Sequence, residues 1–313
     1  MRVIVVGAGV IGLTCAVRLR EAGYDANVLA RDLPAETTSA VAAALWYPYR
    51  ALPQGKVSRW AKSSYGVLSG IAASAPDAGV RMRWGTELLR TNGAEPWWRA
   101  AVPVVEAAHD VPDGYAGGWR LPVPVADTSA YLPWLVGRLE ALGGTLTRCW
   151  LPALPDEGIV VNCTGLAARA LTDDDSLHPV RGQVVYVAQV GLTEWLLEQS
   201  DAAALTYVVP REHDIVVGGT ADEDVYDPRP DPSVAEQILT RAGALLPQLT
   251  TAAVLGNRVG LRPARPEVRL ESVPHPDGES GGVVHCYGHG GAGITLSWGC
   301  ADDVVTEVAA LAR

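Results

Sequence analysis

Phenylalanine is absent from this sequence of 313 residues, and no segment is rich in lysine and arginine. Asp and Glu number 35 against 25 Lys and Arg, which gives a formal net charge of −10. An acidic chain without a basic run binds nucleic acid or an anionic membrane surface poorly. We therefore expect no nucleic acid and no membrane among its partners.

Disulfide frameworks and zinc sites are disfavoured as well, because the five cysteines include no CxxC pair. Scattered cysteines of this kind suit the reducing cytoplasm. Long apolar runs are also missing, since no stretch approaches the roughly 18 apolar residues that cross a bilayer. The apolar N-terminus is interrupted by glycines and lacks a small-residue cleavage site, so it differs from a signal peptide. These absences predict a cytoplasmic protein.

What the N-terminus does contain is typical of a dinucleotide-binding turn. VIVV (3–6) predicts a buried strand, LTCAVRLREAG (13–23) a helix, and NVLA (27–30) a second strand. A GxGxxG pattern lies between the first strand and the helix, formed by Gly7, Ala8, Gly9, Val10, Ile11 and Gly12. Such a turn lets a diphosphate approach the N-terminus of the helix. An ordinary glycine-rich turn is the alternative.

The second strand should end near the adenosine ribose, where an acidic residue is expected. Here the strand is followed by Arg31 and Asp32. Either Asp32 holds the ribose from one position late, or Arg31 faces the adenosine. The sequence leaves this choice open.

The rest of the chain alternates between helical and strand patterns. Residues 33–45 end in an alanine run that can pack tightly or start a helix, and residues 46–130 show no helical period over long spans. Helices are predicted at 134–144 and 233–247, and strands at 158–165, 182–187, 205–210 and 214–219. We expect an α/β fold in which a Rossmann-type domain (1–45, 131–180 and 281–313) is interleaved with a β-rich domain (46–130 and 181–280).

A second glycine-rich segment stands near the C-terminus, where YGHGGAGITLSWG (287–299) has four glycines within six residues. Glycine contributes no side chain to a core, so such a loop indicates that something lies close to its backbone. A helix-capping turn is the alternative. His289 within it is either a base or, more simply, a structural residue.

Six motifs together resemble the D-amino-acid oxidase family, which also includes D-aspartate oxidases. They are VIVVGAGVIGL (3–13), TTSAVAAALWYPY (37–49), VNCTG (161–165), RGQVV (181–185), VGLRPARPEVRLE (259–271) and VVHCYGHGGAGITLSWG (283–299). The first is generic to dinucleotide binders, and the last two are specific to this family. The resemblance implies non-covalent FAD as cofactor and a D-amino acid and molecular oxygen as substrates. A homodimer is left open.

The resemblance also implies cofactor contacts along the whole chain. The glycine loop runs against the flavin, and the carbonyl of Gly291 faces the substrate amine. Besides the residues of the GxGxxG turn and Arg31 and Asp32, the implied contacts are Thr38, Ser39, Ala43, Ala44, Leu45, Leu151, Arg269, Gly290, Gly291, Gly293, Ile294 and Thr295.

An amino-acid substrate needs a cation for its carboxylate, and arginine binds a carboxylate bidentately. LRPARPEVRL (261–270) offers Arg262, Arg265 and Arg269. Arg269 lies on a short β-like run and is also the residue that the family match selects. Arg262 and Arg265 stand beside prolines and fit a surface or salt-bridged role better. The resemblance adds Tyr207, whose hydroxyl would give the carboxylate a second hydrogen bond.

Three departures from the family pattern bear on substrate choice. Ala203 stands where animal members carry a lid tyrosine, and Tyr47 replaces a glutamine beside the site. Ala221, followed by three acidic residues (222–224), stands where D-aspartate oxidases carry an arginine. We therefore expect oxidation of neutral D-amino acids with no protein acid or base. A D-aspartate oxidase, a glycine or amine oxidase, and a non-enzymatic flavin-binding protein are the alternatives.

Overall fold

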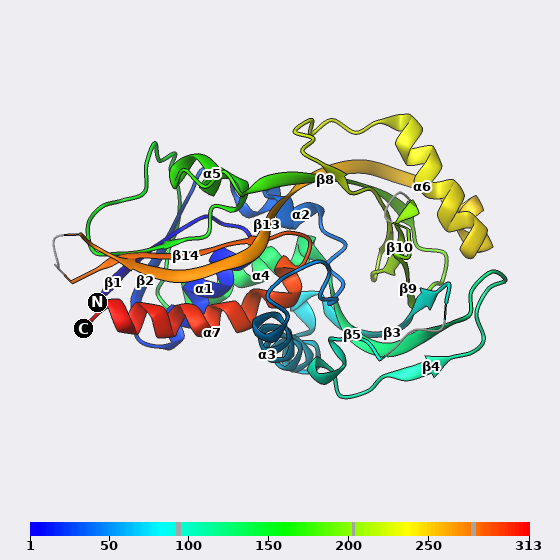
Figure 1. Cartoon of the computed structure of the whole chain (residues 1–313), viewed down its shortest axis with the longest axis horizontal. Helices are drawn as coiled ribbons and strands as arrows, with labels where there is room; N and C mark the ends of the chain where they lie inside the picture. Colours follow the sequence, from blue (N-terminus) through cyan, green and yellow to red (C-terminus); the bar gives the residue numbers. More distant parts are fainter. Residues whose placement is uncertain (92–94, 202–203, 277–279) are drawn as a thin grey trace.

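A computed structural model describes residues 1–91, 95–201, 204–276 and 280–313 (Figure 1). Its helices are α1 (Val10–Glu21), α2 (Thr38–Val41), α3 (Gln54–Ser74), α4 (Thr128–Ala141), α5 (Ala168–Leu171), α6 (Pro232–Leu245) and α7 (Gly293–Leu311). Its strands are β1 (Arg2–Val6), β2 (Asp25–Ala30), β3 (Val80–Leu89), β4 (Glu106–Ala108), β5 (Gly117–Ala126), β6 (Leu146–Arg148), β7 (Ile159–Asn162), β8 (His178–Ala188), β9 (Trp195–Glu198), β10 (Thr206–Pro210), β11 (Asp214–Gly218), β12 (Asp222–Glu223), β13 (Val254–Pro274) and β14 (Gly282–His289).

The strands join edge to edge in the order β4-β5-β3-β9-β10-β11-β8-β13-β14-β7-β1-β2-β6, and β12 pairs with β8. Strand β13 is shared, because it pairs with β8 along one part of its length and with β14 along another. Figure 1 shows β13 running from the end where the two termini lie to the end where α6 lies. The mixed α/β class expected from the sequence is confirmed, while the division at residues 45, 130, 180 and 280 stays a prediction.

A parallel group of strands comes from the beginning, middle and end of the chain. β1 pairs in parallel with β2 and β7, and β7 pairs in parallel with β14. Most side chains of these strands are apolar and buried, as in a sheet covered on both faces. Helices α1 and α7 pack together against this group. The predicted strands at 3–6 and 27–30 and the helix at 13–23 are therefore confirmed, while the segment predicted at 158–165 is a strand only over β7, at 159–162.

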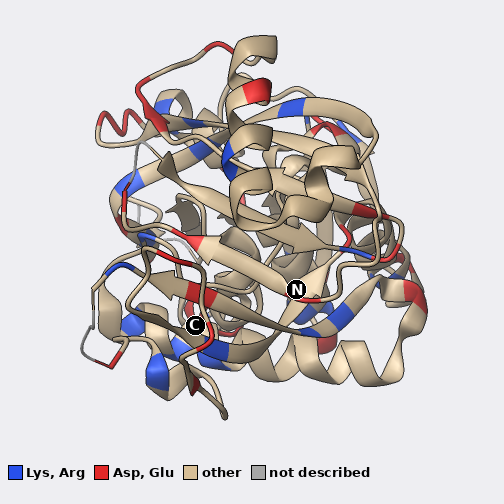
Figure 2. Cartoon of the chain, turned by 90° about the vertical axis from the view of Figure 1, so that its right-hand side faces the viewer, with Lys and Arg blue, Asp and Glu red and all other residues tan. Residues whose placement is uncertain are grey.

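The antiparallel group contains the strands predicted at 182–187, 205–210 and 214–219. β11 pairs with β8 and β10, and β10 pairs with β9. Helix α6 covers this group through a separate small apolar core that includes Val208, Val217 and Ile238. In Figure 2, Lys and Arg are interspersed with Asp and Glu.

The expectation of no long helical period within residues 46–130 is wrong, because α3 spans 21 residues. Its buried face includes Val57, Trp60, Ser64 and Leu68, which follow helical spacing. The pattern is hard to see because the face includes a serine and the helix contains three glycines. Helix α4 begins at Thr128, earlier than predicted, behind an Asp127 cap. In the described residues, no helix is both long and apolar enough to cross a membrane.

Candidate active site

A cavity of about 910 Å³ lies where the two groups of strands meet. Its walls come from the turn after β1, the ends of β2 and β7, the strands β8, β10 and β13, and the loop before α7. This volume is at the upper end of the range found for ligand-binding pockets, as a large elongated ligand requires. The site is therefore built from segments that are far apart in the sequence.

One end of the cavity has the geometry of an anion-binding turn. Gly7 adopts φ +115°, and a Cβ there would collide with the carbonyl group of Cys163. Gly9 precedes the first turn of α1, and the Val10 amide donates to the Ser39 hydroxyl at 3.0 Å. The helix N-terminus thus faces the cavity, and its dipole favours an anion there.

Most of the residues expected to contact a cofactor do line this cavity. They are Gly7, Ala8, Gly9, Val10, Ile11, Arg31, Asp32, Thr38, Ser39, Ala43, Ala44, Leu45, Leu151, Gly290, Gly291, Gly293 and Ile294. Gly12 does not line it, since a Cβ there would meet the Gly7 carbonyl and the residue serves the packing of the turn. Thr295 is also set back from the cavity, and its hydroxyl instead exchanges hydrogen bonds of 3.0 and 2.9 Å with the Tyr47 backbone.

Arg31 and Asp32 form one unit at the mouth of the cavity. The Arg31 Nε and Nη2 atoms donate to the two carboxylate oxygens of Asp32 at 2.9 and 2.6 Å. The hydrogen bond from Arg31 lowers the pKa of Asp32. Both residues line the cavity at this point, and the choice between Asp32 and Arg31 as the ribose contact stays a prediction.

The opposite end of the cavity contains Arg262 on β13. Its Nη1 atom donates to the Thr220 carbonyl at 2.8 Å, and its guanidinium lies over Gly182, where a Cβ would collide with it. Burial raises the pKa of Tyr207, and the neighbouring Arg262 guanidinium opposes that rise. An added Cβ on Gly291 would lie 2.8 Å from Tyr49 and 3.6 Å from the Arg262 Cδ atom. A guanidinium, two tyrosines and a glycine backbone therefore meet around one point.

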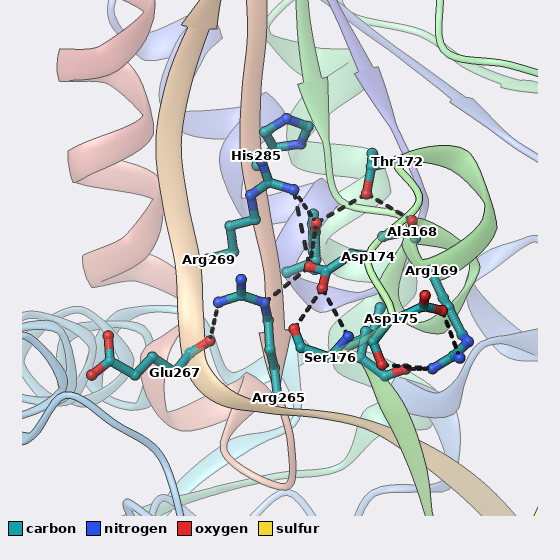
Figure 3. A network of polar contacts seen from close by, with 12 residues as sticks. Ala168, Arg169, Thr172, Asp174, Asp175, Ser176, Arg265, Glu267, Arg269 and His285 are labelled. Atoms are coloured by element: carbon teal, nitrogen blue, oxygen red, sulfur yellow. Dashed lines mark hydrogen bonds and ion pairs between the residues drawn. The ribbon is translucent and has the colours of Figure 1, made fainter.

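Arg269 lies elsewhere, which differs from the expectation. It is not among the cavity-lining residues of the described chain. Its Nε atom donates to Glu271 at 2.7 Å and its Nη1 atom to the Tyr287 hydroxyl at 2.6 Å. Figure 3 shows Arg265 and Arg269 directed from β13 toward Asp174. The surface or salt-bridged role expected of Arg262 and Arg265 fits Arg265 and Arg269 instead.

Asp174 is the centre of that network. Burial by itself raises the pKa of its carboxyl, but hydrogen bonds from Ser176, Tyr287 and Arg265 outweigh burial and lower the pKa to about 2. Because Tyr287 also lines the cavity, the network holds one wall in place. Its role is structural.

Two of the three acidic residues that follow Ala221 pair with basic side chains instead of facing the cavity. Asp222 pairs with Arg181 at 3.2 Å, and Glu223 pairs with His178 at 3.1 Å. Within the described chain, neither lines the cavity. Ala203, which stands where animal members of the family carry a lid tyrosine, lies outside the described residues.

Tyr47 lines the cavity as expected, and its hydroxyl reaches a buried carboxylate. It donates to the Glu87 Oε1 atom at 2.8 Å and accepts from Trp98 and Gln199. The sequence gives no pattern that selects Glu87 or Tyr49, and it offers Arg262 as one of three arginines but with a surface or salt-bridged role. The glycine at 182, which leaves room for the Arg262 guanidinium, is 80 residues away in the sequence and gives no local signal.

Four buried cysteines also gather beside the cavity, although their spacing gave no sign of it. The sulfur atoms of Cys15, Cys163 and Cys286 lie within 4.8 Å of one another, and Cys300 and His289 adjoin Cys286. His289 lies 3.9 Å from the Cys286 sulfur through its Nε2 atom. Its ring is thus turned to the thiol cluster, which favours the structural role for this histidine.

The cavity fits a dinucleotide with a reactive ring. Backbone amides and glycines form one end, where a diphosphate can lie against α1. Gly290, Gly291 and Gly293 leave the far wall free of large side chains, so a flat ring can lie against backbone. Arg262, Tyr207 and Tyr49 line the cavity next to these glycines, and the Arg262 guanidinium can bind a small carboxylate beside the ring.

Comparison with known proteins agrees with this geometry. The model of the FAD dependent oxidoreductase family matches residues 2–307. A D-amino-acid oxidase of Rubrobacter xylanophilus is 49% identical, covering 99% of this chain and 95% of that protein. One from Streptomyces coelicolor is 44% identical, covering 96% and 94%. The solved glycine oxidase of Geobacillus kaustophilus has the same fold, with TM-score 0.84 and 19% identity over 99% of this chain and 95% of its own. The chain therefore belongs to the FAD-dependent oxidoreductase family, and FAD is its cofactor.

Proposed function

We propose that the protein is a D-amino-acid oxidase that converts neutral D-amino acids and oxygen into 2-oxo acids, ammonia and hydrogen peroxide. The observation that carries this is the convergence of Arg262, Tyr207 and Tyr49 on the glycine loop at Gly291. A carboxylate can pair with Arg262 and accept a hydrogen bond from Tyr207. The 49% identity to a D-amino-acid oxidase supports the substrate class.

The protein's part in the reaction is binding and orientation. Arg262 and Tyr207 hold the carboxylate, and the Gly291 carbonyl accepts a hydrogen bond from the amine. These contacts turn the substrate Cα hydrogen toward the flavin position. When bound, FAD supplies the acceptor for that hydride and passes the electrons to oxygen. No side chain acts as an acid or base, and the rate depends on alignment.

Arg262 takes the role that the sequence assigned to Arg269. Both side chains are half-buried, but Arg262 lines the cavity whereas Arg269 pairs with Glu271. FAD is held without a covalent bond, and the enzyme works in the cytoplasm, where its free cysteines stay reduced.

An absorption spectrum followed by anaerobic titration tests the proposal. The purified protein should be yellow, and neutral D-amino acids should bleach it while their L-isomers do not. Readmitted oxygen should restore the colour and release one equivalent of peroxide. A colourless protein that binds a nicotinamide dinucleotide, or bleaching by L-isomers alone, would contradict it. Faster oxidation of D-aspartate than of any neutral substrate would contradict the neutral preference.

A further inference from the structure

Glu87 on β3 lies in the same row of paired residues across the sheet as Tyr207, the tyrosine proposed to bind the substrate carboxylate. Glu87 is the register partner of Leu197 on β9, and Leu197 is the partner of Tyr207 on β10. Paired residues on adjacent strands project from the same face of a sheet. Tyr207 and Leu197 both line the cavity, so Glu87 projects from the cavity face as well.

The row also sets how far Glu87 lies from the carboxylate-binding end. Neighbouring strands are about 4.8 Å apart, so the backbones at Glu87 and Tyr207 are about 10 Å apart. Leu197, Leu205 and Val209 form the apolar wall around this stretch of the cavity. A substrate whose carboxylate pairs with Arg262 has room to extend its side chain along this wall toward Glu87.

The environment of Glu87 is unusual for a buried acid. The residue is 6% exposed, and its carboxylate accepts from Tyr47 at 2.8 Å and from Gln199 at 2.7 Å. Burial raises the pKa of this carboxyl, and the two hydrogen bonds oppose that rise. No ion pair joins it to a Lys, Arg or His of the residues that the structure describes.

The buried Glu198 provides a contrast, because it has Arg90 at 3.5 Å. Burying a carboxylate without a cation is costly, and groups of this kind gather at functional sites. The described side chains that donate to Glu87 are uncharged: Tyr47, which lines the cavity, and the half-buried Gln199. A cationic group of a ligand can supply the charge that these donors lack.

We propose that Glu87 is a specificity-determining residue for the substrate side chain, at the far end of the cavity wall formed by Leu197, Leu205 and Val209. This inference rests on the proposed function. Among the charged D-amino acids that can enter beside the neutral substrates, the charge of Glu87 favours those whose side chain ends in a cation and disfavours those whose side chain ends in a carboxylate. Tyr47 transmits this preference, because it lines the cavity and its hydroxyl holds the carboxylate. A negative charge in a site shielded from water acts over several ångströms on a second charge.

Glu87→Gln tests the proposal, because it removes the charge and keeps the shape. The substrates are two matched pairs: D-lysine with D-norleucine, and D-glutamate with D-glutamine. In the variant, kcat/KM for D-lysine relative to D-norleucine should fall at least about tenfold, and D-glutamate relative to D-glutamine should rise by a similar factor. Both ratios unchanged within about twofold would overturn the proposal.

Glu198→Gln is the matched control. Glu198 follows Leu197 on β9 and therefore projects from the opposite face of the same sheet, and it is 2% exposed. This variant should keep both wild-type ratios. An equal change in the two variants would show that burial of any glutamate matters, and it would also overturn the proposal.

Two further measurements keep the question decidable. If Glu87→Gln fails to fold, Glu87→Asp can be measured instead. It keeps the negative charge, so the D-lysine to D-norleucine and the D-glutamate to D-glutamine ratios of kcat/KM should each stay on the same side of one as in the wild type. In the wild type, D-glutamate and D-glutamine oxidised equally well would refute the inference without any variant. The proposed function fails separately, since oxidation of D-norleucine and D-glutamine tests that activity without involving a charged side chain.

Discussion

Replacement of Arg262 by leucine tests the geometry of the site most directly. The side chain lines the cavity, and its guanidinium lies beside Tyr207 and over Gly182. Loss of one partner of a buried charge pair costs about 2–5 kcal/mol, which is roughly thirty-fold to several thousand-fold in affinity. Arg262→Leu should therefore lower kcat/KM for D-alanine, D-valine and D-methionine by such a factor.

The assay is steady-state oxygen consumption together with FAD content. Arg262→Lys should fall in between, because lysine keeps the charge but cannot bind a carboxylate bidentately. The free energy of unfolding should change by only about 1 kcal/mol in Arg262→Leu, through the lost hydrogen bond to the Thr220 carbonyl. A KM effect that exceeds the kcat effect would identify substrate binding as the affected step.

Arg269→Leu is the matched control from the same strand. Its partner Glu271 is exposed, and exposed ion pairs contribute about 0–1 kcal/mol. Arg269 also donates to the Tyr287 hydroxyl, but without Arg269 that hydroxyl keeps its hydrogen bond to Asp174. Activity in this variant should stay within a few-fold of the wild type. Near-normal kinetics in Arg262→Leu, or an equal loss in Arg269→Leu, would refute the assignment of the carboxylate to Arg262.

Three other predictions follow from the same contacts. Gly291→Val should weaken FAD binding and turnover together, since its Cβ would lie 2.8 Å from Tyr49, whereas Gly137→Ala, with no atom within 4 Å of the new Cβ, should affect neither. Asp174→Asn should lower the free energy of unfolding by about 2 kcal/mol at pH 7, because the folded pKa of about 2 lies below the ordinary aspartate pKa of 3.8. The contribution of the Asp174 carboxylate to stability is complete above the unfolded pKa and is lost as the pH falls through 2. The difference in free energy of unfolding, measured with urea, should therefore be about half as large near pH 3. Asp175→Asn is the control, and it should change stability little at either pH because Asp175 is 94% exposed. Acid precipitation should release all FAD into the supernatant, and flavin retained on the polypeptide would contradict non-covalent binding.

Local patterns explain which parts of the site could be predicted from the sequence. The glycine turn at residues 7–12 and the loop at 288–293 are each fixed by a few neighbouring residues, and both lie on the cavity. Arg262 and Arg269 are harder to separate, because they share one strand and the sequence does not show where it bends. β13 has a register shift between Ala264 and Arg269, and this irregularity breaks any simple alternation of faces.

Glu87 could not be found from the sequence for a different reason. Its place beside Tyr207 depends on β3 pairing with β9 and β9 with β10, and two of these strands are more than 100 residues apart in the chain. Helix α3 was missed because its buried face mixes serine with large aromatic residues. Non-local pairing and mixed faces carry no short-range signal.

Strand β14 has a consequence for how the protein is made. It lies between β13 and β7, so it joins the two groups of strands, yet it follows all the other described strands in the sequence. A nascent chain on the ribosome has β7 and β13 with unpaired edges until residues 282–289 have emerged. Such edges are prone to pairing with other chains. FAD also has no complete cradle until the glycine loop has emerged, since this loop follows β14 directly. Any truncation from the C-terminus that reaches β14 should therefore yield aggregated protein rather than a smaller folded domain.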